Sequence, residues 1–150
     1  MATLRTIFES AGFADVTTVL NSGNVVFASD SVPDAAALES RILAETGVNT
    51  RLIVLDAARL ERVVQDMPFA GDESRLVISV ADGPPPSASA PDDLAPEQVQ
   101  VGPDAIYQHC PDGISKSKLT LAFWKQFSPE TTARNLRTMK KLLALVTHRP

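Results

Sequence analysis

The sequence has little of what several protein classes require. One cysteine and two histidines among 150 residues exclude an intramolecular disulfide framework and a cysteine-rich zinc module, and they favour a reducing compartment. No run of 18 apolar residues is present, so no segment is predicted to span a membrane. The N-terminus lacks the basic start and unbroken apolar stretch of a signal peptide. We therefore predict a cytoplasmic protein with no membrane partner.

Charge is distributed unevenly along the chain, although the net charge is only −4. Residues 1–115 contain 6 Lys and Arg against 17 Asp and Glu, whereas residues 116–150 contain 8 Lys and Arg and one acidic residue, Glu130. A basic C-terminal segment of this kind indicates either nucleic-acid binding or docking onto an acidic body. We favour docking, because the sequence pI is about 5.1 and few aromatic side chains are available to stack on single strands.

Apolar periodicity and turn-forming residues predict short helices and strands joined by tight turns. Helices are predicted at residues 4–11, 34–45, 57–65 and 118–127 and from 128 onward. Strands are predicted at residues 16–20, 25–27, 51–55, 75–81, 99–101 and 105–110. Residues 83–96 contain five of the 11 prolines, so they are predicted to form a surface loop.

The order of these elements predicts the fold class. Hairpins join neighbouring strands, and repeated strand-helix-strand crossovers are absent, so the sheets are expected to be largely antiparallel with helices on one face. The predicted class is α+β. The helix at 57–65 is expected to link two small subdomains, residues 1–55 and residues 56–150, the second of which ends in two helices.

Several separated motifs are specific enough to compare with known families. They are TVLNSGNVVF at 18–27, MPF at 67–69, IY at 106–107, PDGISKSKLT at 111–120, TARNLRT at 132–138 and KL at 141–142. In their order and spacing, over about residues 2–145, they resemble the bacterial family known as domain of unknown function 1697. The resemblance implies no particular activity, since that family has none assigned.

One departure from the family pattern concerns the N-terminus. Family members usually begin with a further strand and a glycine-rich Arg-Gly-Ile-Asn-type segment, upstream of the helix at 4–11. The resemblance implies that a complete first subdomain has the ferredoxin-like order β-α-β-β-α-β and that this chain lacks the first strand. We expect lower stability and self-association, because a missing strand exposes a sheet edge with unpaired backbone groups.

The segment from Gly113 to Lys118 is the first candidate for ligand binding. A glycine turn followed by Ser115, Lys116, Ser117 and Lys118 offers backbone N–H groups, hydroxyls and two ammonium charges, which suit a phosphate or a carboxylate. The spacing of a Walker A loop is missing. The structural alternative is a strand-to-helix turn in which Ser115 or Ser117 caps the helix.

Arg134, Asn135 and Thr138 are the second candidate. On the predicted last helix, Arg134 and Thr138 lie one turn apart and could bind one oxyanion. The alternative is that Arg134 pairs with a carboxylate of the acidic body and Asn135 bonds a loop carbonyl. If the two candidates converge, they form a single polar pocket.

Ser22, Gly23 and Asn24 are secondary candidates because they match a motif of the family. A structural role is favoured, since a tight turn needs positive φ at Gly23 and the Asn24 side chain can cap it.

Metal and nucleophilic chemistry find little support in the sequence. His109 and Cys110 are adjacent in a predicted strand, so their side chains point to opposite faces, and His148 is close to the end of the chain. Cys110 is expected to be a buried thiol, and no Gly-x-Ser-x-Gly elbow is present. We predict no metal and no cofactor, and we identify no catalytic residue.

Three functions remain, in order of preference. The first is a binding module for a small anionic ligand or nucleotide that uses the 113–118 turn and the 134–138 segment. The second is nucleic-acid binding by the basic C-terminal segment. The third is an enzyme of unknown reaction that needs the missing N-terminal segment.

Overall fold

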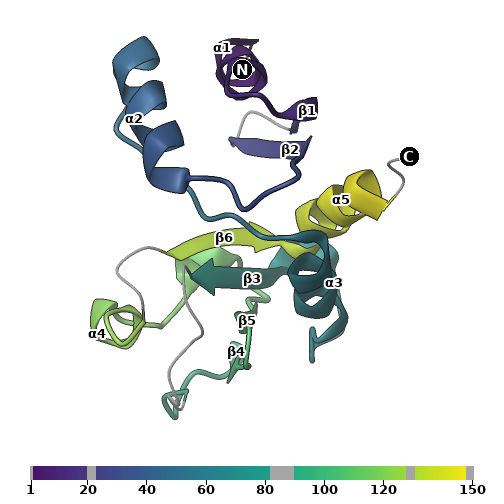
Figure 1. Cartoon of the computed structure of the whole chain (residues 1–150). Helices are drawn as coiled ribbons and strands as arrows, with labels where there is room; N and C mark the ends of the chain where they lie inside the picture. The colour runs from purple at the N-terminus through teal and green to yellow at the C-terminus, as the bar shows by residue number, and fades with distance from the viewer. Residues whose placement is uncertain (1, 20–22, 82–89, 128–130, 148–150) are drawn as a thin grey trace. The chain divides into compact units, whose positions relative to one another are not determined.

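The structure is a computed structural model that describes residues 2–19, 23–81, 90–127 and 131–147. Helices and antiparallel sheets are both present (Figure 1), which confirms the α+β class. The chain divides into two compact units, Met1–Val54 together with Ala144–Pro150, and Leu55–Leu143. This division differs from the predicted subdomains chiefly at residues 144–150. None of the helices in the described ranges has the length and apolar character needed to cross a bilayer.

The first unit contains two helices and one hairpin. In chain order its elements are α1 (Ala2–Ser10), β1 (Ala14–Val19), β2 (Asn24–Ala28) and α2 (Ala35–Thr46). The two strands pair antiparallel. The apolar faces of the helices and of β1 form one core, made by Ile7, Phe8, Val16, Leu38 and Ile42. The predicted helices and hairpin of this unit are confirmed to within a few residues.

The ends of the helices follow local signals in the sequence. Asp34 caps α2 by accepting a hydrogen bond from the Ala37 amide at 3.1 Å. Gly47 ends the same helix in the left-handed conformation, with φ of 77°, where glycine is favoured because it has no Cβ.

The predicted strand at residues 51–55 is wrong, because these residues are described without strand structure. Among the described residues, the sheet of the first unit contains β1 and β2, and residues 51–55 pair with neither of them, although a strand requires such backbone pairing. The apolar Leu52 packs against the core of the unit. Partial burial of residues 52–55, with Leu52 against the core, is consistent with the apolar character of this segment. The predicted self-association through a sheet edge stays a prediction.

The second unit contains a four-stranded sheet with the order β4-β5-β3-β6. All three strand pairs are antiparallel. Its elements are α3 (Ala57–Gln65), the 3-10 turn η1 (Glu73–Arg75), β3 (Leu76–Ala81), β4 (Gln98–Val101), β5 (Ile106–His109), the 3-10 turn η2 (Ile114–Lys116), α4 (Leu121–Trp124), β6 (Thr131–Asn135) and α5 (Leu136–Thr147), which extends beyond the unit. Every residue of β3 is buried, as expected for a central strand.

The register of this sheet decides which side chains share a face. Val77 is paired with both Gln108 and Asn135, and Ile78 with both Tyr107 and Arg134. Because successive side chains of a strand alternate between faces, Gln108 lies on one face while Tyr107 and Arg134 lie on the other.

Different helices cover the two faces of the sheet. On the Gln108 face, Ile106 forms an apolar cluster with Phe123 of α4 and with Phe127. On the opposite face, the Tyr107 hydroxyl donates a hydrogen bond of 2.8 Å to the Val63 carbonyl of α3.

The predicted helix at 118–127 is much shorter in the structure. The ordered helix α4 runs only from Leu121 to Trp124, and Thr120 caps it by accepting a bond from the Phe123 amide. Upstream, the Lys118 amide donates to a side chain outside the helix, the Glu97 carboxylate. Phe123 and Phe127 of the predicted segment do pack in one apolar cluster, but tertiary hydrogen bonds of the residues before them delay the start of the helix.

The predicted start of the last helix is also wrong. Residues 131–135 form strand β6 along the edge of β3, and α5 begins at Leu136, so Arg134 and Asn135 lie on a strand. The Asn135 side chain accepts a hydrogen bond of 2.9 Å from the Thr138 amide, which is an N-cap contact. The proposed start signal at 128–130 lies outside the described residues. Pairing with a distant strand overrides the local helical pattern here.

Candidate functional site

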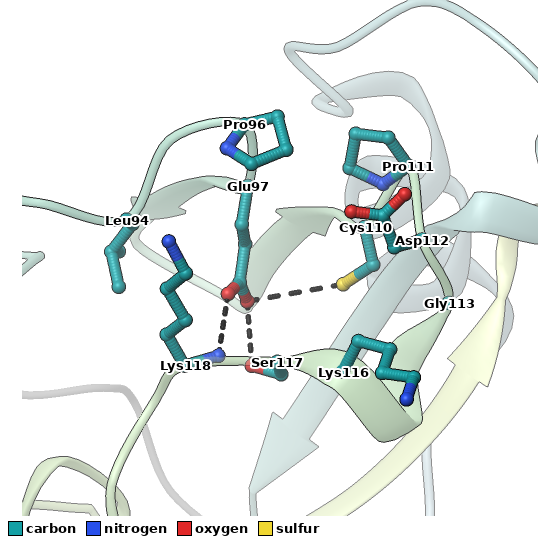
Figure 2. Close-up of a pocket in the computed structure, with 10 residues that line it drawn as sticks. All are labelled: Leu94, Pro96, Glu97, Cys110, Pro111, Asp112, Gly113, Lys116, Ser117 and Lys118. Atoms are coloured by element: carbon teal, nitrogen blue, oxygen red, sulfur yellow. Dashed lines mark hydrogen bonds between the residues drawn. The ribbon is translucent and has the colours of Figure 1, made fainter.

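A pocket lies in the second unit where the ends of β5 and η2 meet the start of β4 (Figure 2). Its lining includes four of the five residues of the first predicted site and excludes Ser115. The lining residues are Leu94, Pro96, Glu97, Cys110, Pro111, Asp112, Gly113, Lys116, Ser117 and Lys118. The 113–118 segment thus forms one wall of a pocket.

The carboxylate of Glu97 lies at the centre of this group (Figure 2). Only 8% of Glu97 is exposed. Its Oε2 accepts a hydrogen bond of 2.6 Å from the Ser117 hydroxyl, and its Oε1 accepts one of 2.8 Å from the Lys118 amide. The serine and backbone donors of the predicted motif therefore hold an oxyanion, and that oxyanion belongs to the same chain.

Gln108 of strand β5 is the third residue that donates a hydrogen bond to the Glu97 carboxylate, and we call these hydrogen bonds the Glu97 network. Its side-chain amide donates to Glu97 Oε2 at 3.1 Å, and only 1% of the residue is exposed. Because the amide nitrogen faces the carboxylate, the amide oxygen must point elsewhere. Among the described residues that oxygen has no hydrogen-bond partner, so the network contains one unused buried acceptor.

Cys110 is a buried neighbour of the same carboxylate. Its Sγ lies 3.9 Å from Glu97 Oε2. Burial, reinforced by the negative charge of Glu97, raises the pKa of the Cys110 thiol to about 11. A nucleophilic cysteine needs a lowered pKa, so the buried, protonated thiol agrees with the structural role expected from the sequence.

The raised thiol pKa predicts a loss of stability at alkaline pH. An unfolded thiol ionises near pH 8.5, so above that pH the unfolded state loses a proton that the folded state keeps, and stability falls as the pH rises toward 11. Between pH 8 and 9.5, the free energy of unfolding in urea should fall more steeply for the wild type than for Cys110→Ala. Equal slopes in the two proteins would contradict the assignment. Tyr107, whose pKa burial also raises, affects stability only at higher pH.

Gly113 is required at the turn between β5 and η2. Its φ is +96°, and a Cβ built on it would lie 2.6 Å from Nη1 of Arg75. A side chain would thus be strained by the backbone and would displace a guanidinium group. The close approach of Arg75 was not foreseen from the sequence.

Lys116 is the lysine of the motif that is open to a ligand. Its side chain extends away from Glu97 in Figure 2, and no interaction with another described residue is found for its ammonium group. The Lys118 ammonium, in contrast, donates a hydrogen bond of 2.9 Å to the Ala95 carbonyl. The Lys116 ammonium is therefore available to bind a ligand, whereas that of Lys118 would first have to give up its hydrogen bond to Ala95.

A comparison with family models decides the affiliation of the chain. The model described as "Protein of unknown function (DUF1697)" matches residues 1–107. The chain belongs to the DUF1697 family. The matched range includes Glu97 and the first two residues of β5 and ends before the 113–118 wall of the pocket. No curated protein matches this DUF1697 member.

A solved structure extends the likeness in fold to nearly the whole chain. It is the conserved bacterial protein SP0830 from Streptococcus pneumoniae, with a TM-score of 0.66 and 18% identity over 97% of this chain and 88% of that one. At this identity the likeness shows the fold alone. This DUF1697 chain therefore shares an architecture with a conserved bacterial protein, and the comparison assigns no activity.

The second predicted site is not brought together with the first in this DUF1697 domain. Arg134 lies on the Tyr107 face of the sheet, opposite Gln108. Its Nη1 donates to the Thr132 hydroxyl and to the Ala133 carbonyl, both at 2.8 Å. With Asn135 used as the cap of α5, the expected single pocket does not form.

The secondary candidates occupy the hairpin turn of the first unit. Gly23 has φ of 78°, and the Asn24 side chain donates to the Val19 carbonyl at 3.3 Å. Ser22 lies outside the described residues. Both described contacts fit the structural role that the sequence favoured.

Part of the basic C-terminal segment docks onto acidic side chains of its own unit. Arg137 lies 4.0 Å from Asp72, and Lys140 pairs with Glu73. These pairs agree with docking onto an acidic body, the interpretation preferred from charge distribution.

Two residues of the site were missed from the sequence. Glu97 follows a proline-rich loop, where a carboxylate is normally solvated, and Gln108 is the polar member of a strand that is otherwise apolar on its inner face. Gln108 could have been found from the sequence, because a polar residue at a buried position of a strand needs a hydrogen-bond partner.

Proposed function

We propose that this DUF1697 domain is a binding module for a small anionic ligand, and that the pocket beside Glu97 receives the anionic group. The observation that best supports the proposal is the hydrogen bonding of a buried carboxylate by the Ser117 hydroxyl and the Lys118 amide. Donors already arranged around one oxyanion are suited to binding another of similar shape.

The charge of the pocket wall also supports an anionic ligand. Lys116 lines the pocket, and its exposed ammonium group is not engaged by another described residue. The Lys116 side chain extends away from Glu97 in Figure 2, but it is exposed and flexible, so it can turn toward an anion in the pocket and form a charge-assisted hydrogen bond with it. We prefer this function to nucleic-acid binding, because Arg137 and Lys140 of the basic segment pair with internal carboxylates.

Replacing Lys116 with alanine should weaken anion binding at least tenfold. A hydrogen bond to a charged group contributes about 1.5 to 3 kcal/mol, which corresponds to a factor of about 10 to 100 in affinity. Inorganic phosphate, acetate and a mononucleotide are titrated into wild type and Lys116→Ala by calorimetry at low salt. We expect saturable binding of at least one of them to the wild type.

Lys125→Ala is the matched control, because it removes the same charge from an exposed position outside the pocket. It should leave the affinity almost unchanged. The proposal fails if none of the three anions binds the wild type, or if both lysine variants lose the same affinity.

A further inference from the structure

We propose that Ser117, Lys118 and Gln108 form a carboxylate-binding site, that Glu97 occupies it as an internal ligand, and that the anionic ligand binds by exchanging its own carboxylate for that of Glu97. The inference rests on the proposed function of the same pocket. It names the chemical class of the ligand and gives Glu97 the role of a competitor.

The geometry of the donors matches the two oxygens of a carboxylate. Oε1 of Glu97 accepts a hydrogen bond from the Lys118 backbone amide at 2.8 Å. Oε2 accepts one from the Ser117 hydroxyl at 2.6 Å and one from the Gln108 side-chain amide at 3.1 Å. Backbone and sheet thus fix donors on both oxygens of a single planar group.

The charge of the donors favours a singly charged anion. The hydrogen-bond donors are a hydroxyl, two amides and, at 3.9 Å, the Cys110 thiol, all neutral, and no ion pair to Glu97 is found within the described parts of the chain. Burial of a doubly charged phosphate would require compensating cations close to its oxygens. A carboxylate, with one negative charge, is the oxyanion that such a set of donors can hold.

The position of Glu97 makes the exchange possible. Its side chain lines the pocket, so the bound carboxylate adjoins the space from which a ligand would enter. A tethered side chain competes like a free ligand at millimolar concentration or above. The wild type is therefore expected to bind simple carboxylates weakly, and removal of Glu97 should expose the site.

Glu97→Ala tests this account with formate and acetate as probes. The variant should bind acetate at least tenfold more tightly than the wild type, measured by calorimetry at constant ionic strength, and acetate should raise its thermal midpoint where sodium chloride does not. Adding Ser117→Ala should weaken this binding about tenfold or more. Ser115→Ala in the same background is the control, because Ser115 is exposed and outside the pocket.

Three results would overturn the inference. The first is a folded Glu97→Ala protein that shows no saturable response to formate or acetate. The second is that this variant binds phosphate more tightly than acetate. The third is that Ser117→Ala and Ser115→Ala reduce the acetate affinity of this variant equally. If Glu97→Ala does not fold, the wild type decides the question. Saturable acetate binding that is lost in Ser117→Ala and kept in Ser115→Ala supports the inference, and absence of this binding overturns it.

Failure of the inference can be told apart from failure of the proposed function. Phosphate binding that depends on Lys116, without any response to carboxylates, overturns the carboxylate site and leaves the anion-binding module in place. A wild type that binds no anion at all overturns the proposed function and the exchange together, even if Glu97→Ala binds acetate.

Discussion

Replacing Glu97 with alanine is expected to lower the free energy of unfolding by about 3 to 5 kcal/mol. The substitution removes the acceptor of the Ser117 hydroxyl, the Lys118 amide and the Gln108 amide. Each buried donor left without an acceptor costs about 1 to 3 kcal/mol, and water entering from the pocket can satisfy part of this set. Urea unfolding followed by circular dichroism measures the loss.

Asp92→Ala is the control for this prediction. It removes the same charge from an exposed residue in the segment that leads to Glu97, and an exposed substitution should change stability by no more than about 0.5 kcal/mol. A loss below about 1 kcal/mol for Glu97→Ala would mean that the carboxylate is solvated. In that case the network described around it would not exist in solution.

Replacing Phe123 with alanine is expected to destabilise the protein by about 3 to 5 kcal/mol, the usual range for a phenylalanine deleted from a core. Only 3% of Phe123 is exposed, and its ring contacts those of Trp124 and Phe127 at centroid distances of 5.2 Å each. These rings cover the Gln108 face of the sheet. Removing Phe123 therefore uncovers the face on which the Glu97 network is built.

Leu121→Ala in the same short helix serves as the comparison, because 70% of Leu121 is exposed. Its loss should cost less than about 1 kcal/mol. Similar losses for Phe123→Ala and Leu121→Ala in denaturant unfolding would contradict the orientation of α4.

Elements with strong local signals could be predicted from the sequence. The helices α1, α2 and α3 follow apolar periodicity, and their ends coincide with residues that cap or stop a helix, such as Asp34 and Gly47. Such signals act within one or two helical turns, so the rest of the fold has little influence on them. The α+β class followed from the same elements.

Elements that depend on distant partners could not be predicted in this way. Residues 131–135 become a strand because they pair with β3, whereas residues 51–55 remain outside the strands because, among the described residues, they pair with neither β1 nor β2. Pairing between segments far apart in the chain is set by the fold as a whole, and it overrides local preference.

Only part of the candidate site could be predicted from the sequence, because its other part also depends on contacts between residues far apart in the chain. The turn at 113–118 was visible because Gly113 and the serine and lysine residues after it are adjacent in the chain. Glu97 could not be linked to them, since the hydrogen bonds that join it to Ser117 and Lys118 span 20 and 21 residues. The pairing of Arg134 with the strand edge likewise removed it from the expected pocket.

The central claim is that the 113–118 segment recognises an anionic group beside Glu97. The most direct test is a backbone amide NMR titration of the wild type with acetate and with phosphate at two salt concentrations. The account predicts saturable shifts confined to residues 113–118 and to Glu97 and Gln108, the other members of the network, with the Lys118 amide among the largest and acetate effective at both salt concentrations. A well-dispersed spectrum without localised shifts for either anion would contradict it.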